Sequence, residues 1–249
     1  MDNQMASEVG MNRTGAKMSP KDAVKSAEGS RKLTSPSIGN ANALGNNRID
    51  FMIESDPVGT VPMPSGLKGA FSALKEKIMQ GDHTFMDKLG ERIAFERSGT
   101  RLYEALISKH KGSKGNEDFP ELSILERFHL EEYQHFLIVS EAMEELGGDA
   151  TAMTPSADVA GVAGFGWVQA ISDPRVTFKQ SLEIILQAEL VDNNCWETLI
   201  ELADKVGLSQ MVERFQKAKE EEDIHLQTIK QWVLEMNTNG GKILSRKVQ

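Results

Sequence analysis

Two short segments of the chain repeat one pattern of metal-binding side chains. Residues 131–135 read EEYQH and residues 221–225 read EEDIH, so each segment has a glutamate three residues before a histidine. Residues three apart lie on one face of an α-helix. A carboxylate and an imidazole together suit iron, manganese or zinc. The repeat therefore predicts a metal site built on helices.

Only one glutamate of each segment follows the apolar row of its helix. Apolar residues spaced alternately three and four apart mark the buried face of a helix. Glu132 and His135 continue one such row, and Glu222 and His225 continue another. The preceding glutamate of each segment lies outside the row, so we expect it to face away from the core.

Two more glutamates occupy matching places in other helical segments. Glu96 and Glu189 each lie in an apolar row, and each is followed seven residues later by an aromatic residue, Tyr103 or Trp196. The two glutamates are 93 residues apart, and the two Glu-x-x-His pairs are 90 residues apart. This internal repeat predicts two similar helical hairpins related by a pseudo-two-fold axis.

Six side chains that could bind metal are thus predicted to face one interior: Glu96, Glu132, His135, Glu189, Glu222 and His225. Burying four unpaired carboxylates would be prohibitively costly. Two divalent cations would balance four carboxylates to zero net charge. The six residues therefore predict a dinuclear metal site.

Two other groups of polar residues are interpreted differently. Glu126 and His129 form a third Glu-x-x-His pair, but the pair is one residue out of phase with the core row, so we expect a solvated flank. Asp192 follows Glu189 by three residues in the core row. We interpret Asp192 as a partner that orients a ligand histidine rather than as an additional ligand.

The remaining candidates for chemistry are a cysteine and two histidines. Cys195 is the one cysteine of the chain, so the sequence has no disulfide framework and no thiolate metal site. We expect Cys195 to be a buried or boundary thiol without chemistry. His83 and His110 fall near the ends of helical segments and are expected at the surface.

Four long helical segments must position the candidate ligands. We expect them over four ranges: about 84–110, 118–147, 173–207 and 209–237. A capping aspartate close to a proline begins the second and third segments, at Asp118–Pro120 and at Asp173–Pro174. Glycines end the second and third segments near 147 and 207.

The lengths of the links between these segments predict their topology. Short links near 112–118 and 207 favour antiparallel neighbours, whereas residues 148–172 are numerous enough to cross a bundle. We therefore expect an all-α fold, an antiparallel four-helix bundle with one long crossover between helices 2 and 3. An apolar stretch at 159–171 is expected to form a helix that covers the site. Its glycines would serve either close packing or the flexing of a lid.

The domain organisation follows from composition. Residues 1–60 are rich in Ser, Gly, Asn and Lys, and we expect a disordered extension. Residues 61–81 are expected to hold a short helical lead-in near 67–79, and residues 82–238 the bundle. Residues 239–249 are expected to be a flexible tail, either a frayed terminus or a docking peptide for a partner.

Bulk properties exclude some classes of protein. The chain has 249 residues, with 37 Asp and Glu against 28 Lys and Arg and a net charge of −9, which argues against a nucleic-acid binder. No run of about 18 apolar residues predicts a membrane span. The N-terminus lacks the apolar region of a secretory signal, so we expect a cytoplasmic protein.

The order Glu, Glu-x-x-His, long crossover, Glu, Glu-x-x-His resembles the ferritin-like di-iron carboxylate superfamily of ferritins and rubrerythrins. The likeness covers about residues 85–236. It implies three ligand roles: bridging or chelating carboxylates at Glu132 and Glu222, terminal carboxylates at Glu96 and Glu189, and nitrogen ligands at His135 and His225. Tyr103 falls where many relatives have a tyrosine near the iron pair, which implies a catalytic role. The alternative is a core tyrosine with a hydrogen-bonded hydroxyl.

The resemblance also implies a cofactor and a reaction. Two iron ions are expected, with a Mn/Fe or Mn/Mn pair as alternatives. Such a pair would activate dioxygen or peroxide as a ferroxidase, peroxidase or oxygenase. One cysteine cannot build the rubredoxin module that rubrerythrins usually carry, so any electron donor would be external, and a homodimer is compatible with the family. The alternative function is a non-catalytic metal-binding, iron-storage or stress protein.

Overall fold

A computed structural model describes residues 19–32, 41–55, 58–62, 72–80, 82–113 and 118–245. These residues contain α-helices and no β-strand, as the sequence predicted. The chain divides into two units, Met1–Asp56 and Pro57–Gln249. None of the described helices is long and apolar enough to cross a membrane.

The described residues of the first unit form two helices. They are α1 (Pro20–Lys32) and α2 (Ala41–Glu54), and neither contains a buried residue. We expected disorder here, and the structure differs by forming local helices. Short helices draw most of their stability from tertiary packing. Among the described residues of this unit, no such packing is seen, because neither helix buries a side chain.

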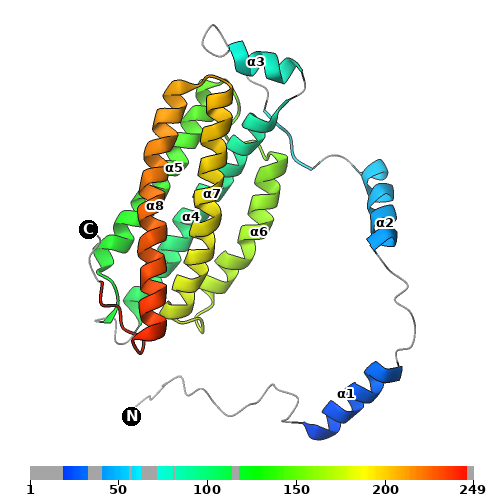
Figure 1. Cartoon of the computed structure of the whole chain (residues 1–249), viewed down its shortest axis with the longest axis vertical. Helices are drawn as coiled ribbons and strands as arrows, with labels where there is room; N and C mark the ends of the chain where they lie inside the picture. Colours follow the sequence, from blue (N-terminus) through cyan, green and yellow to red (C-terminus); the bar gives the residue numbers. More distant parts are fainter. Residues whose placement is uncertain are drawn as a thin grey trace. The chain divides into compact units, whose positions relative to one another are not determined.

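The second unit is a helical bundle with six described helices (Figure 1). They are α3 (Ser72–Met79), α4 (Thr84–Gly112), α5 (Leu122–Glu145), α6 (Pro155–Ser172), α7 (Phe178–Lys205) and α8 (Ser209–Thr238). Helix α4 packs against α5, α6 and α7, and α8 packs against α7 and α5. The first part of the expected lead-in helix, at 67–71, lies outside the described residues.

Two helices begin later than the sequence indicated. The N-cap of α5 is Glu121, beyond the predicted Asp118–Pro120 cap. The N-cap of α7 is Thr177, which forms a capping box with Gln180. The carboxylate of Asp173 instead accepts hydrogen bonds from the backbone and guanidinium of Arg175. An aspartate beside a proline is equally suited to a tight turn, which explains the error.

The segment between α5 and α7 contains the helix that the apolar stretch predicted, α6, and this helix packs against α4. Thr154 caps α6 and also donates a hydrogen bond from Oγ1 to the carbonyl of Asp87, at 3.0 Å. A Cβ atom on Gly90 would lie 2.4 Å from Cγ2 of Thr154, so the glycine permits this close approach. Added Cβ atoms at Gly161 and Gly166 would meet nothing within 4 Å. The tight packing therefore depends on Gly90 rather than on those two glycines of α6.

Two apolar clusters flank the middle of the bundle. One contains Leu89 of α4 and Trp196 of α7, and the other contains Tyr103 of α4 and Ile185 of α7. Along α5, α7 and α8, the predicted ligands fall between the residues of these two clusters, and on α4 Glu96 directly follows Phe95 of the second cluster. The polar residues are therefore enclosed by apolar packing along the length of the bundle.

The end of the chain packs where we expected a flexible tail. Ile243 is buried, and its N–H donates to the carbonyl of Asp118 at 3.0 Å. Glu235 accepts from the N–H groups of Leu244 and Ser245, at 2.7 and 3.0 Å. The described chain ends at Ser245, so the predicted flexibility of residues 246–249 lies outside the described residues.

One histidine also differs from expectation. His110 is buried rather than exposed, and its Nε2 lies 2.9 Å from the carbonyl oxygen of Pro120. Its ring contacts Phe119 and Phe178 edge-on. The later start of α5 leaves the carbonyl of Pro120 outside a helix, so it needs a donor from elsewhere.

Candidate metal centre

The six predicted ligands converge in the centre of the bundle, and each is 3% exposed or less. Their ligand atoms form two groups whose members lie within 4.8 Å of one another. The Glu96 position is the group of Glu96, His135 and Glu222. The Glu189 position is the group of Glu132, Glu189, Glu222 and His225. Because Glu222 belongs to both groups, the two positions are adjacent and share a carboxylate.

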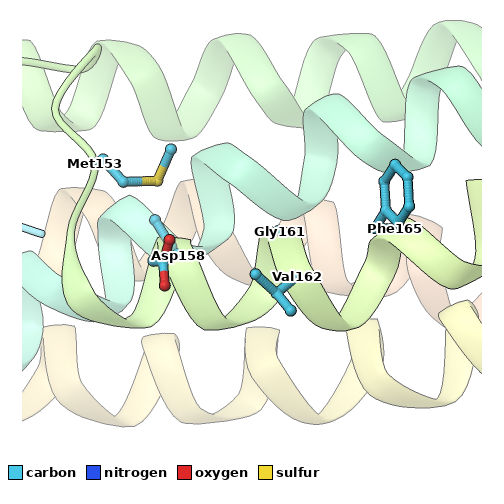
Figure 2. A pocket seen from close by; sticks show the side chains of 6 residues that line it. Met153, Asp158, Gly161, Val162 and Phe165 are labelled. Carbon is cyan, nitrogen blue, oxygen red and sulfur yellow. The ribbon is translucent and has the colours of Figure 1, made fainter. Parts of the chain in front are cut away.

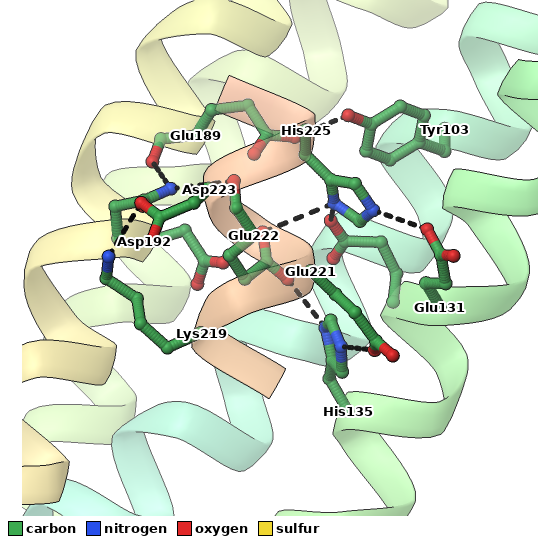
Figure 3. Close-up of polar contacts among 12 residues, drawn as sticks. Tyr103, Glu131, His135, Glu189, Asp192, Lys219, Glu221, Glu222, Asp223 and His225 are labelled. Atoms are coloured by element: carbon green, nitrogen blue, oxygen red, sulfur yellow. Dashed lines mark hydrogen bonds and ion pairs between the residues drawn. The ribbon is translucent and has the colours of Figure 1, made fainter. Parts of the chain in front are cut away.

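Both histidines turn Nδ1 toward the carboxylates (Figure 3). Nδ1 of His135 lies 2.6 Å from Oε1 of Glu222 and 4.0 Å from Oε2 of Glu96. Nδ1 of His225 lies 3.3 Å from Oε2 of Glu222 and 3.6 Å from Oε1 of Glu132. Nδ1 is therefore the nitrogen that each histidine would offer to a metal ion.

Nε2 of each histidine is hydrogen-bonded to a glutamate that was predicted to face away from the core. Nε2 of His135 donates to Oε2 of Glu221, and Nε2 of His225 donates to Oε2 of Glu131, both at 2.8 Å. The partnership is crossed, because each glutamate comes from the helix opposite its histidine (Figure 3). Nε2–H then leaves the Nδ1 lone pair for the centre. The repeated Glu-Glu doublet was the signal for these two residues.

These crossed contacts also shift the acid–base properties of the partners. The hydrogen bond from His135 lowers the pKa of Glu221 below its ordinary value. Burial alone would lower the pKa of His135, but its hydrogen bond to Glu221 and the nearby carboxylates outweigh burial and raise that pKa. The His225 pKa is raised in the same way, chiefly by Glu222.

Asp192 contacts an arginine rather than a histidine. Arg92 is fully buried, and its Nη2 donates to Oε1 of Glu96 at 2.6 Å and to Oδ1 of Asp192. Asp192 was expected to orient a ligand histidine, whereas Nε2 of His135 donates to Glu221 and Nε2 of His225 donates to Glu131. The sequence analysis did not identify Arg92. Its position four residues before Glu96, on the same helical face, was the available signal.

The carboxylates lack enough hydrogen-bond donors. Burial, reinforced by neighbouring carboxylates, raises the pKa values of Glu96, Glu189 and Glu222 well above the ordinary value. Five buried ligand atoms have no hydrogen-bond partner: Oε2 of Glu96, Glu132, Glu189 and Glu222, and Nδ1 of His225. Buried polar atoms are seldom left unsatisfied. Oxygen and imidazole atoms converging in this way fit divalent cations such as iron or manganese.

Tyr103 is a core residue with a hydrogen-bonded hydroxyl, and its catalytic role stays a prediction. It is buried, and its Oη donates to Oε1 of Glu189 at 2.5 Å. Its ring also meets the ring of His225 edge-on, with the centroids 5.9 Å apart. Burial and the charge of Glu189 raise the pKa of the phenol well above its ordinary value. Tyr103 is thus a hydrogen-bonded core residue in contact with two candidate ligands.

Space beside the carboxylates depends on Gly99. A Cβ atom at this position would lie 1.9 Å from Oε2 of Glu132. A small cavity of about 10 Å³ adjoins it, lined in part by Phe95, Tyr103 and Glu189. This volume suits one water-sized molecule.

The residues that were predicted not to bind metal, Glu126, His129 and Cys195, belong to neither ligand group. Glu126 is exposed and accepts a hydrogen bond from Lys111 at 3.1 Å. Cys195 is half-buried, and burial raises the pKa of its thiol. A raised pKa disfavours the reactive thiolate.

A larger hollow lies on the surface of α6 (Figure 2). It has a volume of about 310 Å³ and is lined by Met153, Ala157, Asp158, Gly161, Val162 and Phe165. None of the candidate ligands lines it. The hollow is therefore a surface feature of the crossover and not part of the metal centre.

Comparison with known proteins gives one match. The family model described as Rubrerythrin matches residues 87–233. This range includes all six candidate ligands together with Arg92 and Tyr103. A search of curated proteins and a search of solved structures each found no significant match.

Proposed function

Because the chain belongs to the rubrerythrin family, a ferritin-like di-iron carboxylate family, we propose that its buried carboxylates and histidines hold two iron ions that react with dioxygen or peroxide. The observation that carries this proposal is the set of four buried glutamates, each with one oxygen lacking a hydrogen-bond partner. Two divalent ions would satisfy those oxygens and balance four carboxylate charges.

The two groups of ligand atoms support an assignment of roles. Glu222 would bridge the two ions, because it belongs to both groups. Glu96 and His135 would complete one position, and Glu189 and His225 the other. Glu132 belongs to the Glu189 position only. Of its two predicted roles, bridging or chelating, we therefore propose chelating.

We also propose that the four long helices form the antiparallel ferritin-like bundle with one crossover. One apolar cluster contains the first residues of α4 with the last residues of α5, and the last residues of α7 with the first residues of α8. That combination supports antiparallel pairs. Helix α6 would then be the crossover element.

The pair of iron ions would supply the two electrons that reduce dioxygen or peroxide. Glu131 and Glu221 would keep each histidine in the tautomer that presents Nδ1. Tyr103 would hold a proton on Oη beside Glu189. The cavity next to Gly99 would admit a molecule of the size of water and keep bulk solvent out. An electron donor would lie outside this bundle, since the sequence has one cysteine.

Anaerobic loading tests this proposal. Metal-free protein is titrated with Fe²⁺, bound iron is measured, and dioxygen or hydrogen peroxide is then added. We expect two iron ions per chain and rapid consumption of one oxidant, with the absorption of a di-ferric centre. Glu132→Ala should lose bound iron, and the control Glu126→Ala should keep it.

Two outcomes would contradict the proposal in different ways. Iron-loaded protein that is inert to both oxidants would point to a storage or purely metal-binding role. Tight binding of two ions by Glu132→Ala would show that the ligand set is wrong.

A further inference from the structure

The pseudo-two-fold repeat of the bundle breaks at one buried ion pair. Arg92 lies one helical turn before Glu96, and the matching residue before Glu189 is Ile185. Asp192 likewise corresponds to Gly99 in the other half of the repeat. The arginine and its aspartate therefore stand on one side of the centre only, beside Glu96.

Arg92 is locked into its place by its surroundings. Its guanidinium carbon lies 4.6 Å from the ring centroid of Phe95 and 5.4 Å from that of Trp196. Its Nη2 contacts the carboxylates of both Glu96 and Asp192. An arginine remains protonated in proteins, so the positive charge beside Glu96 is permanent.

The corresponding contact at Glu189 is neutral. Oε1 of Glu189 accepts its hydrogen bond from the phenol of Tyr103. The Glu189 position also gathers four ligand residues, whereas the Glu96 position gathers three. A metal ion at the Glu96 position must compete with a guanidinium for Glu96, and Asp192 offsets only part of that positive charge. An ion at the Glu189 position competes with a neutral phenol instead.

We infer that the Arg92–Asp192 pair makes the two metal positions inequivalent, so that the Glu189 position fills first and the Glu96 position fills second and more weakly. This inference rests on the proposed dinuclear centre and adds an order of loading to it. Metal binding at the Glu96 position has to weaken the charge-assisted hydrogen bond from Arg92 to Glu96. This cost lowers the affinity of that position for metal by about tenfold to a hundredfold. Metal at the Glu96 position is therefore the exchangeable ion.

Titration of the full-length metal-free protein with Co²⁺ tests the inference, with calorimetry and visible absorption as readouts. We expect two binding steps whose affinities differ by about tenfold or more. In Arg92→Met the two affinities should come within about threefold of each other, because Glu96 is released. The matched control is Ile185→Met at the equivalent place in the repeat, and it should keep the wild-type separation.

Two further sets of variants make the result decisive. Arg92→Met/Asp192→Asn removes both charges of the pair and should also bring the two steps together, and it replaces the single variant if Arg92→Met does not fold. Glu96→Gln should abolish the weaker step, and Glu189→Gln the tighter one.

The outcomes separate the inference from the proposed function. Two equal steps in the wild type, or an unchanged separation in the Arg92 variants, would overturn the inference and leave the dinuclear centre standing. Fewer than two Co²⁺ ions per wild-type chain would instead overturn the proposed centre and the inference with it.

Discussion

Glu131 and Glu221 each accept a hydrogen bond from the histidine of the opposite helix, while their neighbours Glu132 and Glu222 turn inward. Adjacent glutamates thus serve different purposes at the same centre. The inner pair could offer oxygens to a metal ion, and the outer pair accepts hydrogen bonds that orient the imidazoles. Loss of the partner of a ligand histidine typically weakens metal binding about tenfold to a hundredfold.

We expect Glu221→Gln to weaken metal binding about tenfold to a hundredfold while the protein stays folded. An amide can still meet Nε2 of His135, but it lacks the negative charge that favours the required tautomer. The measurement is the affinity for Co²⁺ in an anaerobic titration. Glu220→Gln, at the exposed neighbouring position, is the control and should bind like the wild type. Equal affinities in both variants would contradict the role of Glu221.

Gly99→Ala should displace the carboxylate of Glu132 and reduce the number of metal ions bound tightly per chain. The reason is steric, because the new methyl group would fall 1.9 Å from Oε2 of Glu132. The control is Gly161→Ala, whose methyl group would meet nothing within 4 Å. That control should bind metal normally and gain about 0.5–1 kcal/mol of stability, since alanine favours helix. Normal metal content in Gly99→Ala would refute the steric account.

At the scale of elements, α5, α7 and α8 each place one polar turn between two apolar clusters, and α4 places Glu96 directly after the point where the clusters meet. The ligands therefore depend on how four helices are aligned along the bundle. Helix ends contribute to that alignment: α6 is anchored by Thr154 and Asp87, and the chain after α8 folds back onto residue 118. The last described residues belong to the fold rather than to a free tail.

Ile243→Ala should destabilise the second unit by about 2–5 kcal/mol, the usual cost of truncating a buried isoleucine. The side chain is 1% exposed and lies in the cluster that contains Trp232 and Met236. Chemical denaturation of the metal-free protein measures the effect. Leu244→Ala is the matched control, because Leu244 is 71% exposed and should cost little. Similar small effects in both variants would indicate that the end of the chain is not packed.

At the scale of the whole molecule, carboxylates that repel one another are buried in the middle of the second unit. Several carboxylates are buried together with one arginine and two histidines. Burial and mutual repulsion raise the pKa values of Glu96, Glu189 and Glu222. Without metal, protons are the available counter-charge. With metal, divalent ions take their place and release those protons.

The metal-free protein should consequently lose stability as the pH rises. A raised pKa means that the folded state binds protons more tightly than the unfolded chain. The stability that these protonated carboxyl groups contribute is therefore fully present below the ordinary glutamate pKa of 4.5. It is lost as the pH rises through the raised pKa values. The metal-loaded protein should show the opposite trend over the same range, because metal competes with protons for the ligands.

Thermal unfolding of both forms between about pH 5 and pH 8 measures this difference. The range begins just above the ordinary glutamate pKa of 4.5, where the raised pKa values take effect. Saturating Co²⁺ should raise the unfolding temperature most at the upper end of the range. Triple substitution of Glu96, Glu189 and Glu222 by Gln should flatten the pH dependence of the metal-free form. A metal-free wild type that gains stability toward pH 8 would contradict the raised pKa values.

The helical pattern was sufficient to predict much of the fold and the candidate site. Phase along each helix depends only on the chain's own periodicity, so it predicted the burial of Glu96, Glu132, His135, Glu189 and Glu222 without knowledge of neighbours. The same holds for His225, and the apolar stretch at 159–171 predicted the helix α6. Helix starts were less certain, because Asp173 beside a proline suits a turn as well as a cap.

The tertiary structure decided which side chains of separate helices contact one another. Glu131, Glu221 and Arg92 acquire their roles from the rotation and axial alignment of separate helices, which no repeat within one helix specifies. The same is true of Ile243, whose burial requires the chain to return to residue 118. Sequence periodicity by itself determined which side chains face the interior. Only packing decided which of them touch, because a contact depends on the relative placement of two elements and not on either one alone.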